Sequence, residues 1–263
     1  MLLRAVGIGA PRIHKNRFMP LMLAIGTLLS LTLPAAANEP AEAWRKISDR
    51  NGIEVFVSYS ETSRLKTFRG ITTMELPDEF AMLALYNDID AFPMWLHMID
   101  GAELINERHP TDRDLRFTIS LPWPLMDREV YLTSKLAYVV NINEESVTAY
   151  LEGDSSMAEP NEDYVRLPEL HGAFSFRRLA PDVVEATFQI SADLGGYLPM
   201  WVVNFAFRDI PYFTLEKMRR IVKKEEYQNH YYDYLPLFGP GRPADLPQPK
   251  SWVYGTSLDD DTE

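Results

Sequence analysis

Side chains that could carry out catalysis are few and lie far apart in the sequence. The chain has five histidines and no cysteine, which removes thiol nucleophiles, thiolate metal ligands and disulfides. His97, His109 and His171 form no His-Glu-x-x-His zinc motif, and no Gly-x-Ser-x-Gly nucleophile elbow occurs. The acidic run 259–263 lacks the glycine and the spaced ligands of a calcium loop. We therefore expect no catalytic residue, no metal site and no cofactor.

The apolar residues predict a sheet followed by one long helix. Residues 183–192 alternate apolar and polar side chains, with Phe188 and Ile190 on the apolar face of the expected strand. Residues 198–227 change to a helical period that only Pro211 interrupts, so a long, kinked terminal helix is expected. Its first half is apolar on nearly every side and must be covered all round. The cover could be the protein core alone, or the core together with a bound apolar molecule or a membrane surface.

Shorter signals place the remaining elements. Pro77-Asp78-Glu79 favours the start of a helix. Two prolines flank Trp123, so residues 121–124 form a loop that presents Trp123 at its tip or tucks it inward. In an antiparallel, meandering sheet we expect further strands over 53–59, 65–74, 103–106, 115–121, 130–140, 147–151 and 172–179, with short helices over 41–48 and 90–97.

This order of elements, together with several motifs, resembles the START domains, which have a helix-grip architecture. The motifs are Trp44 with Asp49-Arg50-Asn51-Gly52-Ile53, Phe68-Arg69-Gly70, Phe92-Pro93-Met94-Trp95, Met126-Asp127-Arg128-Glu129-Val130, and Asp193-Leu194-Gly195-Gly196 leading through Pro199 to Asn204. The last is the most specific, whereas the Asp-Arg-Glu order departs from the Arg-Asp pair of the family. The resemblance runs from Trp44 to Phe238. It implies an α+β fold in which a curved antiparallel sheet wraps around a long C-terminal helix and encloses an apolar cavity.

The resemblance also implies where a ligand would lie. The apolar strand face would line the cavity beneath the terminal helix. Phe188, Ile190, Trp201 and Phe205 are therefore candidate cavity residues. Ordinary core packing is the alternative for each of them.

Two polar residues and one loop complete the candidate site. Arg116 and Asn204 each stand among apolar neighbours, and either could anchor a polar headgroup if its side chain reached the cavity. The alternative is local satisfaction, which is usual for lone buried polar groups. The Trp123 loop resembles the loop that closes over the cavity mouth; its ring could touch a membrane interface or act as a hydrophobic plug.

The expected function is non-catalytic binding, with transfer between membranes, of a lipid or other apolar small molecule by a monomer. Two other classes stay open at this stage. A cyclase or aromatase, as among related helix-grip proteins, would need an acid-base residue inside the cavity. A regulatory or scaffold module would instead hold a partner chain in an apolar cleft.

The N-terminal segment predicts export. Basic residues precede the apolar run 18–33, which ends in Ala35-Ala36-Ala37 and is shorter than the roughly 20 residues that cross a bilayer. We expect a signal peptide over 1–37 that is cleaved near Ala37, one domain over 38–238, and a largely disordered tail over 239–263. The mature protein would be periplasmic or secreted.

The charge balance of the mature chain argues against nucleic acid as a partner. Removal of residues 1–37 leaves 22 basic side chains against 38 acidic ones, a net charge of −16. Such a chain repels phosphate backbones, whose binding depends on charge neutralisation.

Overall fold

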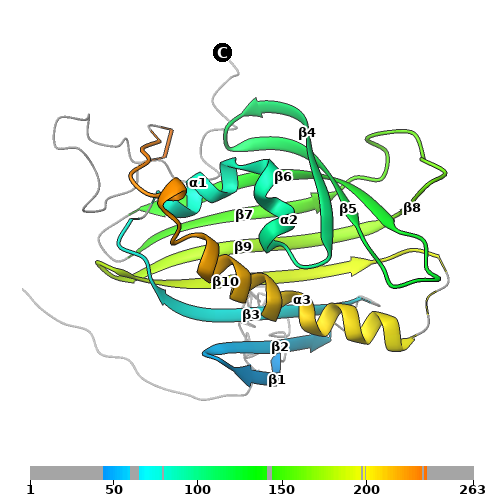
Figure 1. Cartoon of the computed structure of the whole chain (residues 1–263), viewed down its shortest axis with the longest axis horizontal. Coiled ribbons are helices and arrows are strands. Elements are labelled where there is room, and N and C mark those ends of the chain that lie inside the picture. The colour runs from blue at the N-terminus through cyan, green and yellow to red at the C-terminus, as the bar shows by residue number, and fades with distance from the viewer. Residues whose placement is uncertain are drawn as a thin grey trace, which may run out of the picture. The chain divides into compact units, whose positions relative to one another are not determined.

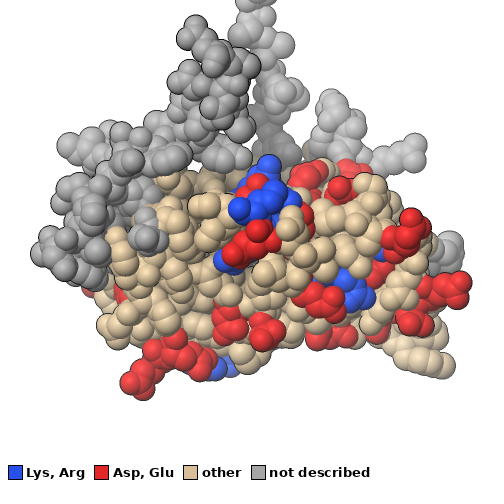
Figure 2. Space-filling model, turned by 90° about the horizontal axis from the view of Figure 1, so that it is seen from above, with Lys and Arg blue, Asp and Glu red and all other residues tan. Residues whose placement is uncertain are grey.

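The computed structural model describes residues 44–59, 65–78, 80–140, 144–196, 198, 200–232 and 234–235, without the side chains of 140 and 200–206. The expected signal segment and the C-terminal tail lie outside these residues. In the part of the chain that the structure describes, no helix is long and apolar enough to cross a membrane. On the face shown in Figure 2, acidic side chains are more widespread than basic ones.

Ten strands form one curved sheet (Figure 1). Its neighbours run in the order β1-β2-β3-β10-β9-β7-β6-β5-β4, and β8 pairs with β6 in parallel. The expected meander is therefore wrong at one point, because β3 pairs with β10, from the far end of the sequence. The strands are β1 (Trp44–Arg50), β2 (Ile53–Tyr59), β3 (Lys66–Glu75), β4 (Ile99–His109), β5 (Asp112–Ile119), β6 (Arg128–Val140), β7 (Glu145–Gly153), β8 (Val165–Arg166), β9 (Glu169–Ala180) and β10 (Val183–Asp193).

The first described element is the strand β1, which corrects the helix expected over 41–48 in its described part, 44–48. β1 pairs with β2 across a two-residue turn in which Asn51 and Gly52 have φ of 53° and 70°. Positive φ at both turn positions matches the right-handed twist of a hairpin and favours pairing of the flanking segments. Trp44 then packs against the next strand but one, with its ring 3.7 Å from the guanidinium carbon of Arg69. Tertiary pairing therefore overrides the local helical pattern.

The helices lie against one face of this sheet (Figure 1). They are α1 (Ala81–Asn87), the single turn η1 (Ile89–Ala91), α2 (Phe92–Trp95), α3 (Met200–Ile221) and the single turn η2 (Glu225–Tyr227). α3 continues through Pro211 but ends before the expected residue 227. It crosses β3 at Gly70, where an added Cβ would lie 2.8 Å from Leu215 and 2.9 Å from Pro211. The missing side chain at Gly70 lets the helix approach the sheet.

Candidate functional site

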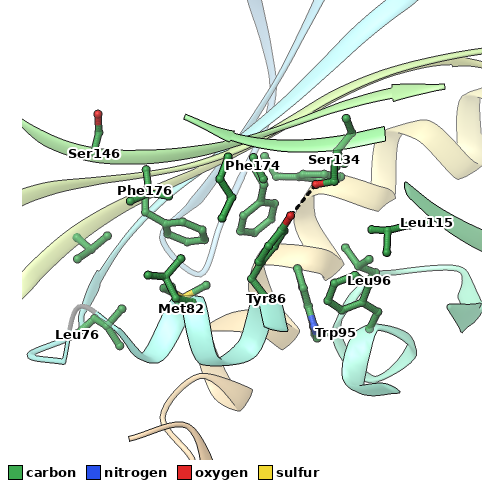
Figure 3. Close-up of a pocket in the computed structure, with 18 of the residues that line it drawn as sticks. Leu76, Met82, Tyr86, Trp95, Leu96, Leu115, Ser134, Ser146, Phe174 and Phe176 are labelled. Carbon is green, nitrogen blue, oxygen red and sulfur yellow. Dashed lines mark hydrogen bonds between the residues drawn. The ribbon is translucent and has the colours of Figure 1, made fainter. Parts of the chain in front are cut away.

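An apolar cavity lies between α1, α2 and the inner face of the sheet (Figure 3). Its walls come from α1, α2 and the strands β5, β6, β7, β9 and β10. The space between atoms there is about 930 Å³, a figure that includes open solvent at the mouth. Leu76 and Met82 lie at one end of the lining, and Leu96 and Leu115 lie at the other. We call this space the first cavity.

A second cavity adjoins the first beneath α3. It holds about 700 Å³ on the same measure, and Phe207, Ile210 and Thr214 of α3 form part of its wall. The two cavities share four lining residues: Leu96, Phe117, Leu151 and Phe188. These side chains therefore separate the two spaces.

Aromatic rings stiffen the wall of the first cavity. Phe174 stands at the centre of one group, with ring centroids 5.4 Å from Trp95 and 5.3 Å from Phe188. Phe92 packs edge-on against Phe117 at 5.7 Å. Such offset and edge-to-face pairs are favourable and orient the rings. The indole Nε1 of Trp95 is buried, and no described residue accepts a hydrogen bond from it.

One pair of hydroxyl groups lies within this apolar lining. Tyr86 reaches from α1 toward the sheet, and its hydroxyl lies 2.9 Å from the hydroxyl of Ser134 on β6 (Figure 3). Burial raises the pKa of Tyr86, although the bond to Ser134 and the charge of Arg113 oppose the rise. The phenol therefore keeps its proton at neutral pH and can donate.

Charged groups border the first cavity only at the outer ends of β7 and β9, within the described lining. Arg178 Nε lies 3.4 Å from a carboxylate oxygen of Glu145, and Arg178 Nη1 donates to the carbonyl of Pro181 at 2.8 Å. Ser146 lines the same end. The two opposite charges compensate each other there.

The second cavity carries one titratable group in its described lining, His97. The ring of His97 packs against Phe213 at 4.8 Å, and its backbone N–H donates to Thr214 Oγ1 at 3.1 Å. Burial lowers the pKa of His97, and nearby Lys217 lowers it further. The imidazole is therefore neutral at pH 7, and this cavity also presents no net charge.

The structure places two predicted cavity residues on the cavity walls. Phe188 lies in the wall between the two cavities, and Ile190 lines the second. Trp201, Asn204 and Phe205 belong to the first half of α3, but their side chains lie outside the described residues. Their proposed contact with a ligand stays a prediction.

Arg116 lies on the other face of the sheet, which corrects its expected place as a cavity anchor. Leu115 and Phe117 face the first cavity, and side chains alternate along a strand, so Arg116 points away. Its guanidinium Nε bonds to Glu129 at 3.0 Å, and its Nη1 bonds to Glu103 at 3.0 Å. Arg116 thus follows the alternative reading, in which its hydrogen-bonding groups are paired with neighbouring residues and not with a ligand.

Trp123 stands at the tip of its loop rather than tucked inward. It is 91% exposed, and Met126 on the same loop is also exposed. The loop begins at Leu121, which lines the second cavity. The buried Arg128 joins this loop to the corner before α3, because its guanidinium donates to the carbonyls of Met126 and Leu194. The loop that carries the exposed tip thus borders the second cavity.

Tyr86 and Ser134 were missed in the sequence, although patterns there pointed to both. Ser134 shares the two-residue period of Val130, Leu132 and Leu136, so it is a polar residue on a dry strand face. Tyr86 follows Met82 at helical spacing, on the face of α1 that lines the cavity. What could not be read from either pattern is that the two hydroxyls meet.

Comparisons with known proteins agree on the fold. No protein-family model matches the chain. An uncharacterized protein of Pseudomonas aeruginosa is 27% identical over 206 residues, which are 77% of this chain and 98% of that protein. The STAR-related lipid transfer protein of Xanthomonas axonopodis has a similar structure, with a TM-score of 0.61 and 24% identity over 69% of this chain and 99% of the other. The chain has the START fold.

A second solved structure supports this assignment at greater sequence distance. Human StAR-related lipid transfer protein 5 matches with a TM-score of 0.59 and 17% identity, over 70% of this chain and 88% of its own. The predicted α+β class, with a curved antiparallel sheet and a C-terminal helix, is therefore confirmed. The two cavities lie inside this fold.

Proposed function

We propose that this protein is a non-catalytic carrier that encloses one lipid-like molecule in the two cavities and transfers it between membranes. The observation that carries the proposal is the first cavity, whose wall is almost wholly apolar and is roofed by α1 and α2. Covering about 200 Å² of an apolar ligand would contribute roughly 5 kcal/mol at about 25 cal/mol per Å². The START fold and the names of its structural neighbours support this class of function.

Native mass spectrometry of the exported protein tests the proposal directly. The protein is purified from the periplasm of its own host, sprayed from volatile buffer, and any co-purifying molecule is extracted and identified. A stoichiometric lipid supports the carrier. A protein that arrives empty and takes up no fluorescent lipid from vesicles would overturn it.

A substitution that fills the cavity links any bound lipid to this space. Ala149 lies on the cavity wall and Tyr150, its neighbour on β7, is half-exposed on the outer face. Ala149→Trp should abolish the stoichiometric ligand, because the indole occupies its volume, whereas Tyr150→Trp should leave it unchanged. Val147→Phe, also on the wall, serves if Ala149→Trp fails the circular-dichroism check of folding. Full occupancy in a folded cavity variant would place the ligand elsewhere.

Export and membrane contact belong to the same proposal. The expected signal segment would send the protein to the periplasm, and the exposed Trp123 loop would meet the bilayer interface during exchange, since Trp prefers that interface. Trp123→Ala should slow transfer between vesicles several-fold and leave equilibrium binding unchanged. Leu179→Ala, another exposed apolar site, is the control. The intact mass of the exported chain tests cleavage after Ala37.

A further inference from the structure

The charged side chains at the cavities have partners of opposite charge. Behind the first cavity, the guanidinium carbon of Arg113 lies 5.3 Å from the Tyr86 ring, and its Nε lies 2.7 Å from Glu107. Glu145 and Arg178 are the charged side chains in the described lining of the first cavity, and they lie 3.4 Å apart at one end. The second cavity adds His97 among its described walls, which is neutral at pH 7 because burial lowers its pKa. The sequence of residues 200–206, Met-Trp-Val-Val-Asn-Phe-Ala, contains no charged residue.

An anionic headgroup would therefore enter a lining with no positive charge left over to receive it. A phosphate or carboxylate in an apolar interior needs a paired counter-charge and several donors. The described lining offers Arg178, which Glu145 and the carbonyl of Pro181 already engage. This balance favours a cargo without net charge.

The Tyr86–Ser134 pair supplies the polar contact that such a cargo needs. Two hydroxyls have two hydrogens and four lone pairs, and the bond between them uses one of each. The pair can therefore donate one further hydrogen bond and accept others. Both residues belong to the cavity lining, so this free capacity is available to a molecule that occupies the cavity.

The position of the Tyr86–Ser134 pair within the first cavity determines how far a ligand could extend to either side of it. Tyr86 stands between Met82 and Phe176 on one side and Trp95, Leu96 and Leu115 on the other (Figure 3). A ligand with its polar atom at the pair can thus extend an apolar body toward the shared wall and the second cavity. No other pair of neutral hydroxyls that bond to each other occurs in the described lining of either cavity.

We propose that the cargo is an uncharged lipid with a single hydroxyl or carbonyl group, held by the hydroxyls of Tyr86 and Ser134. The inference rests on the carrier function proposed above and names its ligand class. Long-chain and polycyclic alcohols share this chemistry. Phospholipids and ionised fatty acids do not.

Matched sixteen-carbon probes test the ligand class. Delipidated mature protein is titrated at pH 7.5 with radiolabelled 1-hexadecanol, hexadecanoate and hexadecane, and with phosphatidylethanolamine in vesicles. Hexadecanol should bind about tenfold more tightly than hexadecane, the gain of one hydrogen bond that is well made in an apolar site. It should also bind more tightly than hexadecanoate.

The outcomes separate this inference from the carrier function. If hexadecanoate or phosphatidylethanolamine binds as tightly as hexadecanol, the uncharged-cargo inference is wrong and the carrier stands. If none of the four probes binds, the carrier function fails as well.

A paired substitution tests the two hydroxyls themselves. Tyr86→Phe combined with Ser134→Ala removes both hydroxyls, so neither hydroxyl is left buried without its partner. The preference for hexadecanol over hexadecane should then fall from about tenfold to near one. Hexadecane affinity should not change. Tyr150→Phe removes a half-exposed hydroxyl from the outer face of β7 and should keep the full preference.

Folding is checked by circular dichroism and by the urea midpoint. Ser134→Ala alone is the smaller change, to be used if the double variant is not folded, and it should lower the preference at least threefold. A folded variant that keeps the tenfold preference would overturn the assignment of the polar contact to this pair.

Discussion

Strands β5 and β6 carry opposite chemistry on their two faces. On the inner face, Phe117 and Ser134 line the first cavity, and the polar group there is a neutral hydroxyl. On the outer face, Glu129 has no exposed side-chain surface and receives bonds from Arg116 at 3.0 Å and Arg166 at 2.8 Å. On these strands the polar group in the cavity lining is therefore neutral, whereas the outer face buries a charged carboxylate.

The difference shows what kind of polar group each environment tolerates. Burial by itself would raise the pKa of Glu129, but bonds from Arg166 and Arg116 outweigh it and hold the pKa below its ordinary value. Fixed partners make the charge tolerable on the outer face. A cavity whose occupant changes has no fixed partner to offer. Neutral hydroxyls suit it, because leaving them unpaired costs far less than leaving a charge unpaired.

The largest expected effect comes from breaking the outer network. Glu129→Ala leaves the guanidinium groups of Arg116 and Arg166 without their shared buried partner, and the free energy of unfolding should fall by about 3–5 kcal/mol. Urea denaturation measures it. Glu103→Ala removes the 60%-exposed partner of Arg116 and should cost less than about 1 kcal/mol. Equal losses of unfolding free energy in the two variants would contradict the view that burial makes this network stabilising.

A smaller effect is expected where the inner face of β3 meets α3. Gly70→Ala places a methyl group against Leu215 and Pro211, which must move or strain. The free energy of unfolding should fall by about 1–3 kcal/mol, as for other overpacked sites. Thr73→Ala, at an exposed position of the same strand, should change it by less than about 0.5 kcal/mol. A neutral Gly70→Ala would show that the helix shifts freely on the sheet.

The smallest expected effect is on the pH dependence of stability, and it has opposite signs for a histidine on the inner side of the sheet and one on the outer face. His97, at the second cavity, has a lowered pKa in the folded protein. Its contribution to the free energy of unfolding is therefore complete above the pKa of the unfolded chain, about 6.5, and declines as the pH falls below that value. Outer-face His171 has a pKa raised chiefly by Glu152, with Glu169 adding to it. Its contribution is complete below about pH 6.5 and is lost as pH rises through the folded pKa.

Melting temperatures at pH 7.5 and 5.5 compare the two histidines. On acidification, His97→Gln should lose less stability than the wild-type protein, and His171→Gln should lose more. The same direction of change in both variants would refute the assignment of opposite shifts.

The amino-acid sequence by itself predicted most of the strands, the terminal helix and the START fold. Alternating residues placed Phe188 on a dry strand face, and the strand limits 53–59 were predicted as observed, because a period of two is a local property. The predicted helix over 41–48 is wrong over its described part, 44–48, because these residues pair with β2. Local preference is a weak guide where a neighbouring strand offers hydrogen bonds.

Only the tertiary structure decided what the polar residues do. Arg116 looked like a cavity anchor among apolar neighbours, yet its strand face carries it to Glu129, because one residue of register reverses every side chain. Tyr86 and Ser134 lie 48 positions apart and meet only when α1 covers β6. Sequence patterns report which face a residue takes within its own element. The partner across the cavity depends on how elements distant in the chain pack together.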